Sequence, residues 1–247
     1  MIRLDVDVTN PGQFFGCCGV FELAQRLWPL ATAHFEGSHF VVSDGDLVEL
    51  VTKTARAPLE VLDPGNQTSS ALRLAEPFNQ RLDWWKVDRG LKTWAGSMSV
   101  DRIAASLQKD LPSTLTNGFF NDGHVVVGSD GKKVEPYYFD GRRGASAMPL
   151  DVGFSSDVLK LETVAYSATE FFTLVGLQRF RPIELKPRVY RYRAWCSALP
   201  ATLAALAAAN VLADNGPLLQ FESAFRTDQR KHKAFSPAVP VNGDGYE

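Results

Sequence analysis

The sequence predicts an α+β protein, in which a mixed or antiparallel sheet packs against helices. Strand-like and helix-like segments follow one another without the regular alternation that a doubly wound parallel sheet requires. Short apolar runs separated by Gly, Pro and Asp, as in residues 117–151, are typical of hairpins. The opening order of strand, helix and strand is also that of a ferredoxin-like or RNA-recognition-type module, which would form the N-terminal part of the chain.

The first elements are the most clearly patterned. Ile2 to Val8 alternates apolar and polar residues, which predicts a half-buried strand. Asn10 is a suitable N-cap for a helix with Pro11 in its first turn, and that helix must end before Pro29. Similar patterns predict further strands at 34–43, 71–75, 79–85 and 188–194, and further helices at 44–56, 99–109, 169–178 and 200–214.

Length and charge set the domain organisation. The chain has 247 residues, and 45% of them are hydrophobic, which is enough to bury one large core. Residues 1–78 carry five basic and ten acidic side chains, whereas residues 79–247 carry 21 and 18. We expect a single α+β unit over residues 1–247, and the uneven charge leaves open a division into an acidic part (1–78) and a more basic part (79–247).

Cysteine usage points to a reducing compartment. The three cysteines are an odd number without recurring spacing, which is not the pattern of a disulfide framework. The longest apolar stretch, residues 198–213, is rich in alanine, contains a proline, and is too short to span a bilayer. These features predict a cytoplasmic protein without a membrane partner.

Basic residues are concentrated in the second half of the chain. A net charge of −2 excludes a protein that holds nucleic acid by bulk charge, but it allows a local basic surface. Residues 179–193 hold six basic side chains against one acid. In a strand, Arg191 and Arg193 project to one face and Tyr190 and Tyr192 to the other. Guanidinium groups in a row suit the oxygens of a phosphate backbone.

Two further segments combine aromatic and basic residues. Lys86, Arg89 and Lys92 lie among three tryptophans, which either stack on unpaired bases or fill the core. Arg142 and Arg143 follow an aromatic run, although Asp140 is a ready ion-pair partner for one of them. We expect the candidate nucleic-acid contacts to gather on one solvent-facing surface: Arg142, Arg143, Arg179, Arg181, Arg188, Arg191 and Arg193, with Lys86, Arg89 and Lys92 in second rank.

A cysteine-dependent hydrolase is the alternative from another functional class. Cys17 and Cys18 are flanked by glycines near the start of the first predicted helix, where the helix dipole lowers a thiol pKa. Neither the four histidines nor any motif supplies a recognisable base, and the same cysteines suit a buried helix face. The chain has no ligand spacing for a metal and no phosphate-binding glycine loop, so we expect no catalytic residues, metal or cofactor.

Four segments resemble one family of CRISPR-associated proteins. They are VTNPGQFFGCCGVFELAQRLWP at 8–29, LKTWAG at 91–96, YYFDGRRGASAMPLDVGFSSD at 137–157 and EFFTLVGLQRFRP at 170–182. The resemblance is to the Csb-type family, a small Cas-eight-like subunit of type I-U (also called I-G) interference complexes. It runs from residue 2 to about residue 200.

This resemblance implies a non-catalytic subunit of a Cascade-like, RNA-guided surveillance complex in antiviral defence. Its implied partners are CRISPR RNA or target DNA, the backbone and RNA-end-binding subunits, and the helicase–nuclease that such complexes recruit. Since base pairing reads the sequence in such complexes, the protein is expected to hold backbone and shape. A purely structural adaptor, whose arginines meet acidic protein surfaces, is the remaining alternative.

Overall fold

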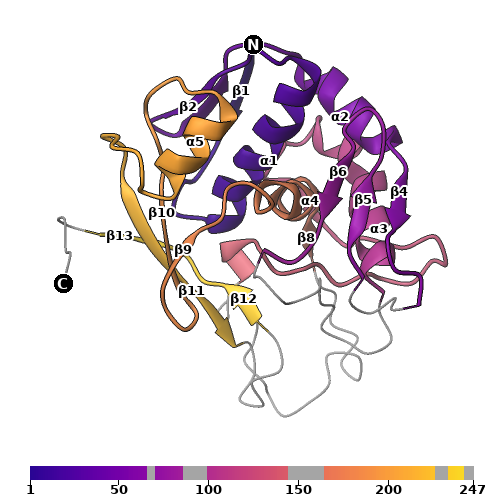
Figure 1. Cartoon of the computed structure of the whole chain (residues 1–247). Coiled ribbons are helices and arrows are strands. Elements are labelled where there is room, and N and C mark those ends of the chain that lie inside the picture. Colours follow the sequence, from indigo (N-terminus) through magenta and orange to yellow (C-terminus); the bar gives the residue numbers. More distant parts are fainter. Residues whose placement is uncertain (66–69, 86–98, 144–163, 226–232, 242–247) are drawn as a thin grey trace.

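The structure is a computed structural model that describes residues 1–65, 70–85, 99–143, 164–225 and 233–241 (Figure 1). It confirms the predicted α+β fold, and every strand pair among these residues is antiparallel. The helices are α1 (Pro11–Leu27), α2 (Leu47–Arg56), α3 (Val100–Thr114), α4 (Ser167–Gly176) and α5 (Ala201–Ala208), with a short 3-10 helix at Gly141–Arg143. The strands are β1 (Ile2–Asp5), β2 (Ala33–Glu36), β3 (His39–Val42), β4 (Leu59–Val61), β5 (Leu72–Leu74), β6 (Gln80–Leu82), β7 (Gly123–His124), β8 (Ala165–Tyr166), β9 (Ile183–Lys186), β10 (Val189–Arg193), β11 (Leu218–Phe225), β12 (Lys233–Phe235) and β13 (Val239–Pro240).

The N-terminal part follows the expected module in its first strands only. Its sheet has the order β1-β3-β2, with α1 between β1 and β2 and α2 after β3. The next strand, β4, pairs with β5 in another sheet, so the fourth strand of a ferredoxin-like module is not placed beside β1. The single strand predicted at 34–43 is a hairpin, because the chain turns at Gly37, where φ is +58°.

Two buried helices form the centre of the molecule (Figure 1). Helix α4 is buried along its whole length, and α1 is buried from Pro11 to Ala24. As predicted, Asn10 caps α1, and its side chain accepts a hydrogen bond from the Gly12 amide. The two helices approach so closely that a Cβ on Gly19 would lie 1.9 Å from the carbonyl oxygen of Phe172. Glycine is therefore required by packing at this crossing.

A second small sheet joins the two charge regions of the chain. Strands β5 and β6 pair on either side of residue 78, and β4 pairs with the other edge of β5. Leu72, Leu74 and Leu82 point inward, whereas Arg73 and Arg81 are exposed and lie directly opposite each other. The hairpin thus spans the position at which the charge balance of the sequence changes.

The C-terminal sheet has the order β12-β11-β10-β9, with β13 paired to β11. The predicted alternation along β10 is confirmed: Tyr190 and Tyr192 are buried, and Arg191 and Arg193 are on the other face. Tyr192 stacks on Phe14 of α1 with ring centroids 4.2 Å apart. One face of this sheet therefore belongs to the core.

Three further predicted elements differ from the structure. The helix expected at 200–214 ends at Ala208, because Asn210 adopts a left-handed backbone with φ of +54°. Helix α3 continues beyond residue 109 to Thr114. The expected hairpin strand around 137–140 is an irregular buried segment, held by side chains rather than by a strand ladder. Within the described chain, no helix combines the length and apolar character that crossing a membrane requires.

Candidate nucleic-acid interface

Arg193 does not present its guanidinium to a ligand. Its Nε and Nη2 donate to the side-chain oxygen of Asn210 at 2.9 and 2.6 Å. Its Nη1 donates to the carbonyl oxygens of Asp214 at 2.9 Å and Gly216 at 2.7 Å. Since these four hydrogen bonds use most of the five N–H groups, Arg193 fastens the segment after α5 to β10. Arg193 therefore keeps little donor capacity for the phosphate contact that the sequence predicts.

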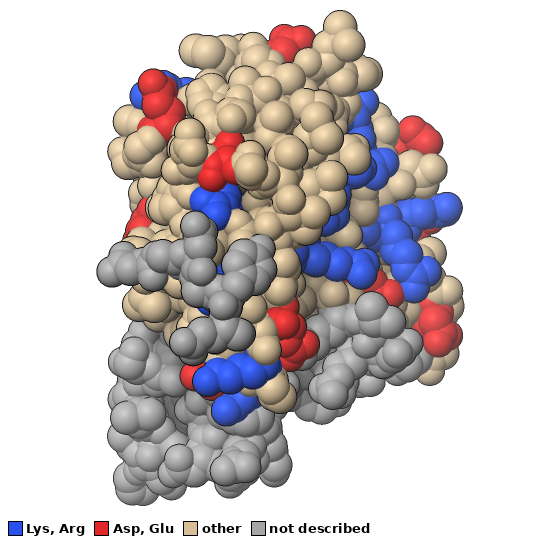
Figure 2. Space-filling model, turned by 60° about the vertical axis from the view of Figure 1, so that its left-hand side comes forward, with Lys and Arg blue, Asp and Glu red and all other residues tan. Residues whose placement is uncertain are grey.

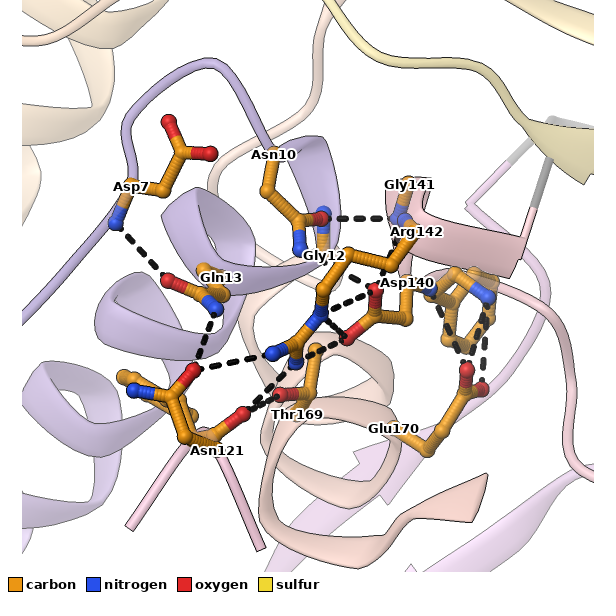
Figure 3. A network of polar contacts seen from close by, with 12 residues as sticks. Asp7, Asn10, Gly12, Gln13, Asn121, Asp140, Gly141, Arg142, Thr169 and Glu170 are labelled. Atoms are coloured by element: carbon orange, nitrogen blue, oxygen red, sulfur yellow. Dashed lines mark hydrogen bonds and ion pairs between the residues drawn. The ribbon is translucent and has the colours of Figure 1, made fainter. Parts of the chain in front are cut away.

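Arg142 is also held inside the protein, in the polar network of Figure 3. Its Nη2 donates to Asp140 Oδ2 at 2.6 Å and to the carbonyl oxygen of Phe120 at 2.7 Å, and its Nη1 donates to Asn121. The guanidinium lies over the ring of Tyr166, 3.5 Å from the centroid. Burial acts to lower the pKa of Arg142, but its hydrogen bonds to Asp140 raise that pKa overall. Arg142 is thus a structural cation.

The same network secures the start of α1 (Figure 3). Asp140, which is fully buried, accepts a hydrogen bond from the Asn10 side chain at 3.1 Å, and Asn10 accepts one from the Gly141 amide at 2.7 Å. Buried Glu170 of α4 accepts hydrogen bonds from the amides of Phe139 and Asp140. The buried carboxylates of Glu170 and Asp140 therefore accept hydrogen bonds from the backbone of residues 139–142, which has no strand partner there.

Arg179 and Arg26 share one buried carboxylate, that of Glu22 on α1. Arg179 donates to it through Nε and Nη2, and Arg26 through Nε and Nη2, the latter at 2.9 Å. Glu22 is only 3% exposed, whereas the side chains of Arg26 and Arg179 are 32% and 39% exposed. Hydrogen bonding to Glu22 raises the pKa of Arg179. Arg26 and Arg179 are thus each anchored by buried Glu22 and partly exposed to solvent.

The neighbouring hairpin extends this cluster of arginines. Arg26 also donates to the carbonyl oxygen of Phe78 at 2.7 Å and to the side chain of Gln80 on β6. Arg81 follows Gln80, and Arg73 lies opposite Arg81 in the register of β5 and β6. Figure 2 shows basic side chains gathered along the right-hand side of its view. Gln178, beside Arg179, bonds with the backbone of Asp83, which follows β6. We name the arginines of these connected segments the arginine band: Arg26, Arg73, Arg81, Arg179 and Arg181.

The other candidate arginines between residues 179 and 193 lie in different surroundings. Arg181 is exposed and belongs to the arginine band, two residues beyond Arg179. Arg188 has a left-handed backbone with φ of +72° at the β9–β10 turn, and its Nη2 lies 3.3 Å from Glu222 Oε1. The Nε of Arg191 is buried without a hydrogen bond to any described residue. Arg191 thus shares a face of β10 with Arg193, whereas Arg142 belongs to the internal network around Asp140.

Four candidates fall outside the described side chains. Lys86, Arg89 and Lys92 lie in the segment between residues 85 and 99, and Arg143 is described only in its backbone. Trp84 and Trp85, which precede them, lie against the core. Trp85 is 6% exposed and packs edge-on against Tyr190, with ring centroids 4.6 Å apart. For Trp85, the core alternative is the correct one.

Sequence reasoning missed Arg26, Arg73 and Arg81. Strands at 71–75 and 79–85 were expected, and a hairpin between them would have placed Arg73 near Arg81. No local pattern predicts the position of Arg26, because the residues to which it donates, Phe78 and Gln80, are 52 and 54 residues away in the chain. Only its hydrogen bonds to Phe78 and Gln80 in the tertiary structure connect it to the band.

The two adjacent cysteines lack what a nucleophile requires. Cys17 and Cys18 are fully buried in α1, and burial raises the pKa of both thiols well above the usual value. The described residues contain no group of three His, Cys, Asp or Glu side chains that could hold a metal ion. The geometry therefore favours the core interpretation of Cys17 and Cys18.

The outer face of the N-terminal sheet carries charged and polar side chains among its described residues. Its outer positions hold the ion pairs Arg3–Glu36 at 2.9 Å and Asp5–His39 at 3.1 Å. Phe35 and Phe40 face the core instead. Comparison of the chain with protein-family models, with curated proteins and with solved structures finds no match in any of the three.

Proposed function

We propose that this chain is a non-catalytic subunit of a type I CRISPR interference complex, in which the arginine band holds the backbone of CRISPR RNA or target DNA. The resemblance of four sequence segments to the Csb-type family supports the complex. The gathering of Arg26, Arg73, Arg81 and Arg179 from α1, the β5–β6 hairpin and the segment after α4 supports the contact. That gathering is the observation on which the proposal rests.

Three arginines of the band keep N–H groups for a ligand although they also pair with carboxylates. Arg26, in contrast, uses four of its five N–H groups within the protein. Arg179 uses Nε and Nη2 on Glu22, and its Nη1 makes no hydrogen bond with a described residue. Arg73 uses the same two atoms on Glu60, and Arg81 uses Nη2 on Asp83. Each of these three guanidinium groups is therefore oriented by an acid on one edge and offers its other edge to a phosphate oxygen.

The placement of Arg73 opposite Arg81 is the clearest sign of an anionic partner. Like charges that face each other across two strands destabilise a sheet by a few tenths of a kcal/mol to about 1 kcal/mol. Both side chains are exposed, with 46% and 65% of their surface accessible. Glu60 and Asp83 offset part of this repulsion, and a phosphate between the two arginines would offset more of it, whereas a neutral ligand would not.

The decisive experiment isolates the full chain, with its natural partners, from the cells that produce it. We expect repeat-derived RNA and the other subunits of an interference complex to co-purify. Ultraviolet cross-linking is then expected to join RNA or DNA to peptides containing residues 73–81 or 179–181. Purification without any nucleic acid would contradict the proposal.

The adaptor function remains the second candidate, because the same arginines suit an acidic protein surface. It predicts that the chain co-purifies with protein subunits and that no cross-link to nucleic acid forms within the arginine band. The cross-linking map therefore separates the two functions in one preparation.

A further inference from the structure

Helix α5 presents an uncharged, apolar face to solvent. Its alanines at 201, 204, 207 and 208 are buried, whereas Leu203 and Leu206, one turn apart on the outer face, are each 42% exposed. Residues 197–213 contain no charged side chain. Figure 2, in which the side of the molecule that carries α5 comes forward, shows a broad uncharged area in its upper part. An exposed apolar surface of this kind is typical of a contact between protein chains.

The apolar face continues beyond the C-terminal end of α5. The left-handed backbone at Asn210 turns the chain back, and the amide of Val211 donates to the carbonyl oxygen of Leu206 at 2.8 Å. Val211, which is 69% exposed, is therefore held beside the last turn of the helix.

A fourth apolar residue lies near the N-terminal end of α5. The side chain of Gln25 accepts a hydrogen bond from the Ala201 amide at 3.2 Å and donates one to the carbonyl oxygen of Ala31 at 3.3 Å. Leu30, which precedes Ala31 and is 92% exposed, is thereby brought close to the start of the helix. We name the α5 face by its exposed apolar residues, in their order along the helix axis: Leu30, Leu203, Leu206 and Val211.

The two ends of α5 lack the charges that commonly compensate a helix dipole. Its N-cap is Pro200, which makes no side-chain capping bond, and α5 has no acid in its first turn and no base in its last turn. The partial positive charge at its start and the partial negative charge at its end therefore have no compensating side chain within α5. A second α5 that packs antiparallel places each end beside the opposite end of its neighbour.

The order of the apolar residues also suits a second copy of the chain. A two-fold axis between Leu203 and Leu206 places Leu203 of one copy opposite Leu206 of the other. The same axis places Leu30 of one copy at the end of the helix pair where Val211 of the other lies. Since residues 197–213 carry no charge, α5 brings no like charges together in this arrangement.

We propose that the α5 face is a self-association surface, on which a second copy of this chain packs its own α5 antiparallel about that two-fold axis. The interface is isologous, because both copies use the same residues. Because it is built around one short helix, the contact is smaller than a standard interface, and we expect a dissociation constant of roughly 0.1 mM. This inference does not depend on the proposed contact with nucleic acid.

The test places opposite charges at the two facing positions. Leu203→Glu and Leu206→Lys each bring unpaired charges into the apolar contact. Each variant alone is therefore expected to self-associate at least about tenfold more weakly than the natural chain, in sedimentation velocity of the full chain over a concentration series. In an equimolar mixture, the introduced glutamate of one variant faces the introduced lysine of the other, and the two natural leucines face each other. Mixed dimers are therefore expected to form more tightly than the dimers of either variant.

Controls separate the α5 face from any other interface. Val48→Glu changes an apolar residue of α2 that is 58% exposed and lies outside the α5 face, and it is expected to leave self-association unchanged. Circular dichroism of each variant checks that the fold is retained. A natural chain that stays monomeric up to about 1 mM overturns the proposal and assigns the α5 face to a different protein. Dimers that persist in both single variants, or a mixture no tighter than its components, overturn it equally.

Discussion

Gly19 of α1 and Gly176 of α4 face each other where the two buried helices cross. A Cβ added at Gly176 would lie 2.7 Å from the Gly19 amide nitrogen and 2.1 Å from the carbonyl oxygen of Phe15. Both clashes are with backbone, which cannot turn aside as a side chain can. The crossing therefore tolerates no side chain at either position.

We expect Gly19→Ala and Gly176→Ala each to lower the free energy of unfolding by about 3 kcal/mol, because overpacking forces the two backbones apart. Urea unfolding followed by circular dichroism measures the effect. Gly65→Ala is the matched control, since a Cβ there meets only the Asp63 side chain, at 3.4 Å. Equal stability of the Gly19 variant and this control would show that the helices do not cross as described.

The pair Asp140 and Arg142 gives a second prediction. Asp140→Ala leaves a half-buried guanidinium without its carboxylate, and we expect a loss of about 3–5 kcal/mol in unfolding free energy. The double variant with Arg142→Met removes both charges and is expected to recover part of that loss. A double-mutant cycle in urea measures the coupling, and a coupling energy near zero would contradict the network of Figure 3.

Substitution of Glu22 is expected to change protein stability and nucleic-acid affinity in different directions. Glu22→Gln removes the charge that Arg26 and Arg179 share, so we expect a loss of about 2 kcal/mol in stability. The same change makes the surface more positive, so affinity for single-stranded RNA should rise or stay constant at low salt. Weaker RNA binding by a folded Glu22→Gln variant would place the binding surface elsewhere.

Salt dependence distinguishes arginines that bind from arginines that hold the fold. We expect Arg81→Gln with Arg181→Gln to make the plot of log affinity for single-stranded RNA against log salt shallower by about 0.7 per arginine. Arg193→Gln is expected to leave the slope unchanged and to cost about 2 kcal/mol of stability, because it breaks internal hydrogen bonds. Arg3→Gln, which breaks the ion pair with Glu36 on the N-terminal sheet, is the control for surface charge. An unchanged slope in the double variant would remove the arginine band from the contact.

The three cysteines are expected to differ in reactivity. Cys196 is exposed, and partial burial together with the charge of Asp214 raises the pKa of its thiol. Alkylation of Cys196 should therefore be slow at neutral pH and should accelerate as pH rises past the usual thiol range, because only the thiolate reacts. Cys17 and Cys18 should react only after unfolding. Mass spectrometry of iodoacetamide-treated chain gives the rates, and rapid labelling of Cys17 in the folded protein would revive the hydrolase alternative.

Local patterns in the sequence were sufficient for elements whose structure depends on near neighbours. The cap at Asn10, the proline at the start of α1 and the alternation of β10 were all predicted and are confirmed. The hairpin of β2 and β3 and the end of α5 depend on left-handed backbone at Gly37 and Asn210. The sequence pattern predicts an uninterrupted strand and an uninterrupted helix at these two places, because apolar periodicity carries no information on the sign of φ.

The sequence by itself determined the α+β class, the central apolar helices and the surplus of arginines in the second half of the chain. Only the tertiary structure decided which of those arginines face solvent. A guanidinium is equally suited to a phosphate and to an internal acceptor, and the choice depends on what distant segments place beside it. Asn210 captures Arg193 and Asp140 captures Arg142, whereas α1 and β6 bring Arg26 and Arg81 to the surface beside Arg179.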